Sequence, residues 1–147
     1  MFQHILVPTD GSELSQATVD KAVRFASEIS ARITFYYAQP DFPMPIYGEG
    51  ALIDPTTPEQ FAQSAAAEAQ AILDRASASA QAAGVTANVD SVVCEVPYEG
   101  IIEAAERHDC DLIFMASHGR KGLAGLLLGS ETQKVLSHSK IPVLIYR

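Results

Sequence analysis

Short apolar runs alternate along this chain with longer stretches in which apolar residues recur every three or four positions. The short runs predict five strands, at residues 5–8, 33–38, 85–94, 111–115 and 141–146. The periodic stretches predict helices over residues 12–30, 57–83, 97–108 and 130–138. Strands that alternate with helices predict an α/β protein, with a parallel sheet that is covered by helices on both faces.

Local start and stop signals support these helices. Ser12 is a natural N-cap, and Thr57-Pro58-Glu59-Gln60 combines an N-cap, a proline at the first helical position and a capping-box glutamine. Gly84 supplies the stop of the second helix. Ser130 and Gln133 have capping-box spacing and predict the start of the last helix. In the strand at 85–94, apolar residues alternate with polar ones, which predicts one solvated face and a place at the edge of the sheet.

Composition narrows the range of partners. The 147 residues predict a single domain over 1–147, and a net charge of -8 argues against duplex nucleic acid and anionic membranes as partners. We expect no membrane insertion and no signal peptide, because no apolar run has spanning length and the chain begins directly with a strand. The two cysteines, Cys94 and Cys110, have no metal-ligand spacing and predict reduced thiols in a cytoplasmic protein.

The stretch from Met115 to Thr132 carries the strongest chemical signal. It leaves a buried strand, contains Gly119, Gly122, Gly125 and Gly129, and enters a helix. A glycine-bearing loop at a helix amino end can surround a phosphate chain with backbone N–H groups. The alternative at this point is a purely structural strand-to-helix connection.

Several familiar chemistries are absent from the sequence. There is no GxxxxGK[ST], GxGxxG, GxSxG or HExxH motif, and the four histidines lack ligand spacing, so we expect no metal held by side chains and no catalytic residue. Asp10 ends the first strand, as in a phosphorylated receiver domain. A receiver also needs an aspartate after its third strand and a lysine after its fifth, where this chain has Cys94 and Tyr146-Arg147.

Four segments together resemble the universal stress protein family over the whole chain: Pro8-Thr9-Asp10-Gly11-Ser12, Met115-Ala116-Ser117-His118-Gly119-Arg120, Leu128-Gly129-Ser130 and Ile141-Pro142-Val143-Leu144. Nucleotide-binding members of that family carry G-x2-G-x9-G-[ST] after the fourth strand. Gly119 and Gly129-Ser130 match this pattern, and Ala116 replaces its first glycine. The extra methyl matters only if the position needs positive φ or close contact with a ligand.

The resemblance implies a Rossmann-like or flavodoxin-like sheet of strand order 3-2-1-4-5 and a site for ATP, with magnesium held mainly by the phosphates. In it, Asp10 hydrogen-bonds the nucleoside. Residues that flank the nucleoside or surround the phosphates would be Pro8, Thr9, Ala38, Met115, Ala116, His118, Gly119, Arg120, Gly122, Gly129, Ser130, Glu131 and Thr132. The implied role is a stress-response regulator with an unknown protein partner, not a fast catalyst.

Two other interpretations stay open. The first is a non-nucleotide-binding, dimeric interaction module of the same family. The second is a nucleotide-activating enzyme of a related fold, although Asp10-Gly11-Ser12 lacks the fuller glycine-rich phosphate loop expected there.

Two further segments carry expectations. The proline-rich stretch from Gln39 to Thr57 predicts a long surface loop and a lid beside the nucleoside. The last strand is apolar on both faces and would be a sheet edge, which predicts a homodimer through residues 142–146, with Val143, Leu144 and Ile145 at the two-fold interface.

Overall fold

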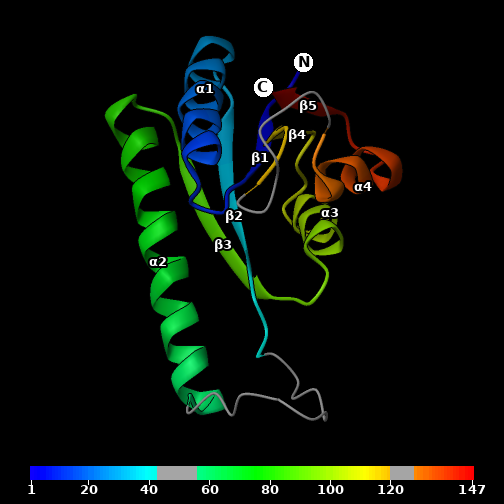
Figure 1. The fold of residues 1–147 in the computed structure, drawn as a ribbon. Coiled ribbons are helices and arrows are strands. Elements are labelled where there is room, and N and C mark those ends of the chain that lie inside the picture. Colours follow the sequence, from blue (N-terminus) through cyan, green and yellow to red (C-terminus); the bar gives the residue numbers. More distant parts are fainter. Residues whose placement is uncertain (43–55, 120–127) are drawn as a thin grey trace.

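The computed structural model describes residues 1–42, 56–119 and 128–147. Strands and helices alternate along the chain, as the apolar pattern predicts (Figure 1). The elements are β1 (His4–Pro8), α1 (Glu13–Ile29), β2 (Arg32–Gln39), α2 (Pro58–Ala82), β3 (Ala87–Val93), α3 (Pro97–Arg107), β4 (Leu112–Ala116), α4 (Ser130–His138) and β5 (Val143–Tyr146).

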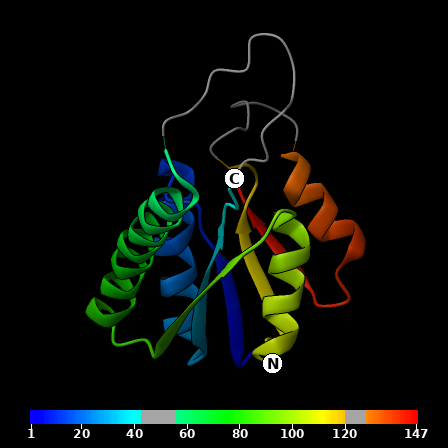
Figure 2. The same ribbon diagram turned by 90° about the horizontal axis from the view of Figure 1, so that it is seen from below.

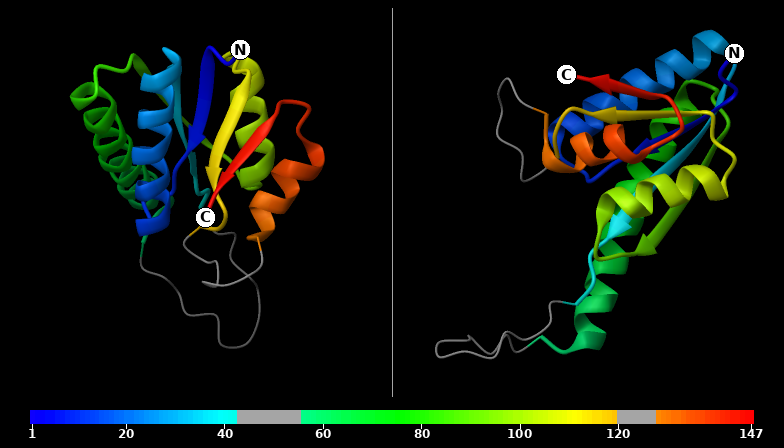
Figure 3. Two further views of the ribbon diagram at one scale, coloured as in Figure 1. Left: turned by 90° about the horizontal axis from the view of Figure 1, so that it is seen from above. Right: turned by 90° about the vertical axis from the view of Figure 1, so that its right-hand side faces the viewer.

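The five strands form one parallel sheet of order β3-β2-β1-β4-β5, which confirms the predicted order. Helices α1 and α2 cover one face and α3 and α4 cover the other (Figures 2 and 3). The chain therefore winds from β1 outward through β2 to β3, and then crosses to β4 on the far side of β1.

The two faces of the sheet bury separate apolar cores. Ile5 and Val7 of β1 pack in the core beneath α1 and α2, whereas Leu6 packs in the core beneath α3 and α4. All three side chains are fully buried. A central strand that is buried on both faces is typical of parallel sheets between helix layers.

The predicted caps hold for α1 and α2. The Ser12 hydroxyl accepts the Ser15 N–H, and Thr57 and Gln60 form the reciprocal capping box. The last helix begins at Ser130, as predicted, but the capping box expected between Ser130 and Gln133 is absent. Gly129 is the N-cap of α4 and its carbonyl accepts the Gln133 N–H, while the Gln133 side chain donates to the Leu128 carbonyl instead.

The edge position predicted for β3 is confirmed. The apolar residues that alternate along this strand are, however, not all buried. Val89 and Val93 are 46% and 51% exposed. On this face of the sheet, the core is formed by Ile33, Phe35 and Tyr37 of β2, and the two valines lie beyond it at the rim.

Two expectations fall on segments outside the described residues. These are most of the predicted lid between Gln39 and Thr57, and the loop tip with Arg120 and Gly122. In the described parts of the chain, no helix is long and apolar enough to cross a bilayer.

The start of β1 is fixed by a carboxylate from the start of β4. Asp111 accepts the backbone N–H groups of Gln3 and His4 at 2.8 and 3.1 Å. The His4 imidazole is buried, and its Nε2 lies 2.8 Å from the Thr34 hydroxyl oxygen. Burial lowers the pKa of His4 below the usual 6.5, and the nearby Arg32 and His108 add to the shift against the opposing effect of Asp111.

This buried histidine predicts a loss of stability in mild acid. The unfolded chain takes up the His4 proton more readily than the folded one, so the free energy of unfolding falls as pH drops below about 6.5 and continues to fall to the lowered folded-state pKa. We expect His4→Gln to flatten this dependence in urea denaturation between about pH 8 and pH 5. The same change at the exposed His138 is the control, and equal pH slopes for all three proteins would contradict the prediction.

Candidate functional site

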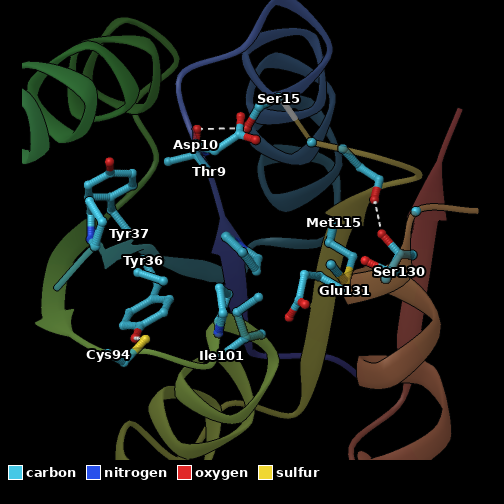
Figure 4. Close-up of a pocket in the computed structure, with 18 of the residues that line it drawn as sticks. Thr9, Asp10, Ser15, Tyr36, Tyr37, Cys94, Ile101, Met115, Ser130 and Glu131 are labelled. Atoms are coloured by element: carbon cyan, nitrogen blue, oxygen red, sulfur yellow. Dashed lines mark hydrogen bonds between the residues drawn. The ribbon is translucent and has the colours of Figure 1, made fainter. Parts of the chain in front are cut away.

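A pocket of about 750 Å³ lies at the carboxyl edge of the sheet, where the loops after β1 and β4 meet (Figure 4). Its volume is within the range of small-molecule sites, roughly 300–1,000 Å³. The described residues of the predicted site all line it: Pro8, Thr9, Asp10, Ala38, Met115, Ala116, His118, Gly119, Gly129, Ser130, Glu131 and Thr132. The structure therefore brings together residues that are up to 124 positions apart, from Pro8 to Thr132.

The loop after β1 is held by its own hydrogen bonds. Asp10 Oδ1 accepts the Ser12 N–H at 2.9 Å, and Gly11 has φ of 79°, a backbone conformation that favours glycine. Ser15 lies in the first turn of α1, where its hydroxyl donates to Thr9 Oγ1 and accepts the Asp10 N–H. This network sets the position of the Asp10 carboxylate at the rim of the pocket.

The loop after β4 approaches this carboxylate so closely that a side chain at Gly119 would displace it. A Cβ atom on Gly119 would lie 2.5 Å from Asp10 Oδ2. On the other side of the loop, the Gly129 N–H donates to the Ser117 carbonyl at 2.7 Å, and the Thr132 hydroxyl donates to the Ala116 carbonyl at 3.1 Å. The amino end of α4 is thereby joined to the carboxyl end of β4.

Ala116, the departure from the glycine motif, lies in regular strand structure. It is the last residue of β4 and pairs with Tyr146 of β5. Among the described non-glycine residues, only Ser30 and Asp109 have positive φ. The backbone at Ala116 therefore does not require glycine. The replacement could affect ligand binding only through contact between the Ala116 methyl group and the ligand.

The amino end of α4 presents backbone donors to the pocket. Gly129 is its N-cap and offers no side-chain cap. The first N–H groups of a helix have no intrahelical partner, and the helix dipole places partial positive charge there. Because Ser130, Glu131 and Thr132 line the pocket, this end of it suits an anionic group.

Glu131 has a structural role that the sequence did not predict. Its Oε2 accepts the backbone N–H of Tyr98 in the first turn of α3 at 2.8 Å, and its Oε1 accepts from Lys134 Nζ at 3.2 Å. The N-cap of α3 is Val96, which provides no side-chain cap. The carboxylate of α4 thus serves as the missing cap of α3.

The wall opposite α4 comes from residues that the sequence reasoning missed. Figure 4 shows Tyr36, Tyr37 and Cys94 on this side, with Ile101 between them and the middle of the view. The full set of additional lining residues is Ser15, Tyr36, Tyr37, Pro40, Asp41, Phe42, Cys94, Glu95, Pro97 and Ile101. Most follow the carboxyl ends of β2 and β3, and the general rule for ligand sites in α/β sheets was the available signal for them.

The thiols of the chain are not activated. Cys94 Sγ lies 4.0 Å from the Tyr36 hydroxyl oxygen, and burial raises the pKa of both groups. Burial also raises the pKa of Cys110 to about 12. Both thiols are therefore protonated at neutral pH, and a nucleophilic cysteine would need the thiolate. Within the described ranges, no group of three or more His, Cys, Asp or Glu side chains is arranged to hold a metal ion.

The fold and the pocket together define a doubly wound α/β protein with a pocket at its topological switch point, where ligands bind in such folds. The family described as the universal stress protein family matches residues 1–147. This chain belongs to the universal stress protein family, as its motifs had suggested.

Similar proteins come from distant organisms. Universal stress protein YxiE of Bacillus subtilis is 30% identical over 158 residues, with all of both chains covered. Universal stress protein MJ0531 of Methanocaldococcus jannaschii is 30% identical over 150 residues, which cover 100% of this chain and 83% of the relative. A universal stress protein whose crystal structure is in complex with cAMP matches with a TM-score of 0.71 and 30% identity, covering 99% of this chain and 97% of the other.

The contact between Glu131 and Tyr98 yields a stability prediction. Glu131→Ala removes the acceptor that caps α3, and we expect the free energy of unfolding to fall by about 1 kcal/mol, as for loss of a helix cap. Glu131→Gln keeps an oxygen acceptor and should lose less than half of that. Urea denaturation of the three proteins measures this, and equal stabilities would show that the contact contributes nothing.

Proposed function

We propose that this chain binds an adenine nucleotide, ATP, in the pocket between β1 and β4 and acts as a stress-response regulator in the cytoplasm. One observation carries the proposal. The pocket joins a carboxylate-bearing loop on one side to an amino end of a helix without a side-chain cap on the other, within a cavity of about 750 Å³. A nucleotide needs both features, a polar contact for its nucleoside and an anion site for its phosphates.

The nucleoside fits the end of the pocket near β1 and β2. Pro8, Ala38 and Met115 supply apolar surface there, and Asp10 supplies a hydrogen-bond acceptor at the rim. Ribose hydroxyl groups donate hydrogen bonds to such a carboxylate. The relative crystallised with cAMP supports an adenine nucleotide as the ligand class.

The phosphates fit the amino end of α4. Backbone N–H groups from Ser130 to Thr132 and the Ser130 hydroxyl surround this end of the pocket, with His118 and Gly119 across from them. Magnesium would be held mainly by the phosphates themselves. Arg120 and Gly122 are proposed to complete the phosphate contacts from outside the described residues.

Two carboxylates of the described pocket have other roles. The carboxylate of Glu131 is engaged by Tyr98 and Lys134, and Asp10 belongs to the nucleoside side. A general base must reach the attacking water. We therefore propose a regulator whose bound nucleotide controls an unknown protein partner, with slow hydrolysis at most.

A second candidate function is a non-nucleotide-binding interaction module. The observation that favours it is the acidity of the pocket, which is lined by Asp10, Asp41, Glu95 and Glu131. Carboxylates that are not neutralised by cations repel phosphates. Calorimetric titration with MgATP separates the nucleotide-binding regulator from the interaction module.

The proposal predicts a charge-sensitive phosphate site. Ser130 is the first residue of α4, where glutamate favours the helix, so Ser130→Glu leaves the fold intact while its charge opposes the phosphates. We expect the parent to bind MgATP with micromolar to sub-millimolar affinity and Ser130→Glu to bind at least about tenfold more weakly, a loss of about 1.4 kcal/mol. Ser130→Gln, of similar size and uncharged, should lose less in the same calorimetric titration.

Replacing Gly129 by valine would also be expected to block phosphate binding, but this substitution tests the site less cleanly than Ser130→Glu does. A Cβ atom at Gly129 would lie 3.1 Å from His118 Cα, so a branched side chain there disturbs the loop as well as the ligand. Ala116→Gly should tighten MgATP binding only modestly, because the strand backbone does not require glycine there. No heat from either the parent or Ala116→Gly would favour the interaction module.

The proposed homodimer forms through β5 and residues 142–146. In the single chain, the β5 side chains are only partly buried, although Leu144 packs against one core and Val143 and Ile145 against the other. The strand lies at the edge of the sheet and leaves one row of backbone groups for a partner.

We expect Val143→Lys to convert a dimeric parent to monomers in analytical ultracentrifugation at micromolar concentration, because two lysines would meet across the two-fold axis. Leu136→Lys is the matched control. It changes another apolar residue, 41% exposed on α4 and away from β5, and should leave the dimer intact. A monomeric parent would rule out this assembly.

A further inference from the structure

The second edge of the sheet, β3, has an open row of backbone groups. In the described part of the chain, β3 pairs with β2 alone. The Thr86 carbonyl and the Cys94 N–H both bond to β2. Backbone groups alternate between the two sides of a parallel strand, so residues 88, 90 and 92 also face β2, and residues 87, 89, 91 and 93 face outward.

The usual protections of an edge strand are missing from this row. Soluble proteins blunt edges with lysine, proline or a bulge. The outward row consists of Ala87, Val89, Ser91 and Val93, which are all uncharged. Its register with β2 is regular over all seven residues of the strand, without a bulge. The edge is therefore long and regular enough to accept another strand.

The two faces of this edge differ in chemistry. Val89 pairs with Phe35, whose side chain lies in the core under α1 and α2, so Val89 and Val93 extend toward that face and leave it apolar. Asp90 pairs with Tyr36 on the α3 face, where its carboxylate is bonded by Arg107 and by His108 Nε2 at 2.8 Å.

Three glutamates border the edge on the α3 face, and one of them, Glu99, accepts a hydrogen bond from the Tyr98 hydroxyl at 3.2 Å. A groove beside the carboxyl end of β3 is lined by Cys94, Glu95, Val96, Glu99, Gly100 and Glu103. The three glutamates are exposed, and Glu99 and Glu103 are one turn apart on α3. No lysine or arginine lines this groove, and Arg107 on the same face is paired with Asp90. The groove at the carboxyl end of β3 is therefore acidic, while the α2 face of the edge is apolar.

We propose that β3 is a docking edge for an extended segment of a partner protein in which β-branched residues alternate with lysine or arginine. The segment adds a sixth strand, its apolar side chains lie beside Val89 and Val93, and its basic side chains lie beside the glutamates of the groove. Backbone hydrogen bonds give such strand addition its affinity, and the alternate side chains give it specificity. A second copy of this chain does not fit, because pairing two β3 edges would bring two acidic grooves together.

The probe is a labelled Lys-Val-Lys-Val-Lys-Val-Lys peptide, which matches the seven residues of β3, and the readout is fluorescence polarisation with the whole protein. We expect binding of this peptide and none of its glutamate-for-lysine counterpart. Val89→Pro removes an outward N–H without removing a bond to β2, and should weaken binding at least about fivefold. Val89→Thr keeps that N–H and should bind like the parent.

Charge is tested separately. Glu103→Gln should weaken binding about two- to fivefold, as for loss of a surface charge pair, whereas Glu28→Gln on the opposite side of the sheet should not. Hydrogen exchange of the parent gives a test that needs no substitution: the peptide should protect the amides of Val89, Ser91 and Val93.

Equal binding to Val89→Pro and Val89→Thr, or protection confined to β5, would overturn the proposal and indicate nonspecific attraction or the other edge. A parent whose oligomeric state depends on Val89→Pro in ultracentrifugation would overturn it as well, because the edge would then be an interface between copies.

Discussion

The pairing of β1 with β4 is the constraint on which the rest of the molecule depends. After β3 the chain must return across the sheet, and the bonds from the Asp111 carboxylate to the N–H groups of Gln3 and His4 fix the new strand beside the first. The connections on either side of this pair run to opposite faces of the sheet. The loops that leave β1 and β4 consequently separate and leave a crevice between them.

Hydrogen bonds join the α4 side of the crevice to two neighbouring elements. Thr132 joins α4 to β4, and Glu131 joins α4 to the first turn of α3. An anion at the amino end of α4 would therefore act on a helix that also caps α3. This coupling offers a physical route from an occupied pocket to the outer surface of α3, which borders the acidic groove beside β3.

Features that depend on neighbouring residues could be predicted from the sequence. The caps at Ser12 and Thr57 need only side chains three positions apart, and both are present. No capping box forms at Ser130, because Ser130 is the first residue of α4 and Gly129 is the N-cap, so the Gln133 N–H donates to the Gly129 carbonyl and not to the Ser130 hydroxyl. The spacing of residues in the sequence does not show which acceptor the Gln133 N–H donates to.

Features that depend on tertiary contacts could not be predicted from the sequence. The burial of Val89 depends on where α2 lies, and the role of Glu131 depends on the distance from α4 to α3. The pocket itself was predictable on the β1 and β4 sides, since both loops carry recognisable motifs. Its β2 and β3 side, with Tyr36 and Cys94, carries none, and only the fold brings these residues to the site.

The central claim is that an adenine nucleotide occupies the crevice between β1 and β4. The most direct measurement is the amide NMR spectrum of the isotopically labelled protein during titration with MgATP. We expect saturable shifts at Thr9, Asp10, Gly119 and the first turn of α4, with little change in the amides of β3. No shift at saturating nucleotide, or shifts that lie mainly away from these loops, would contradict it.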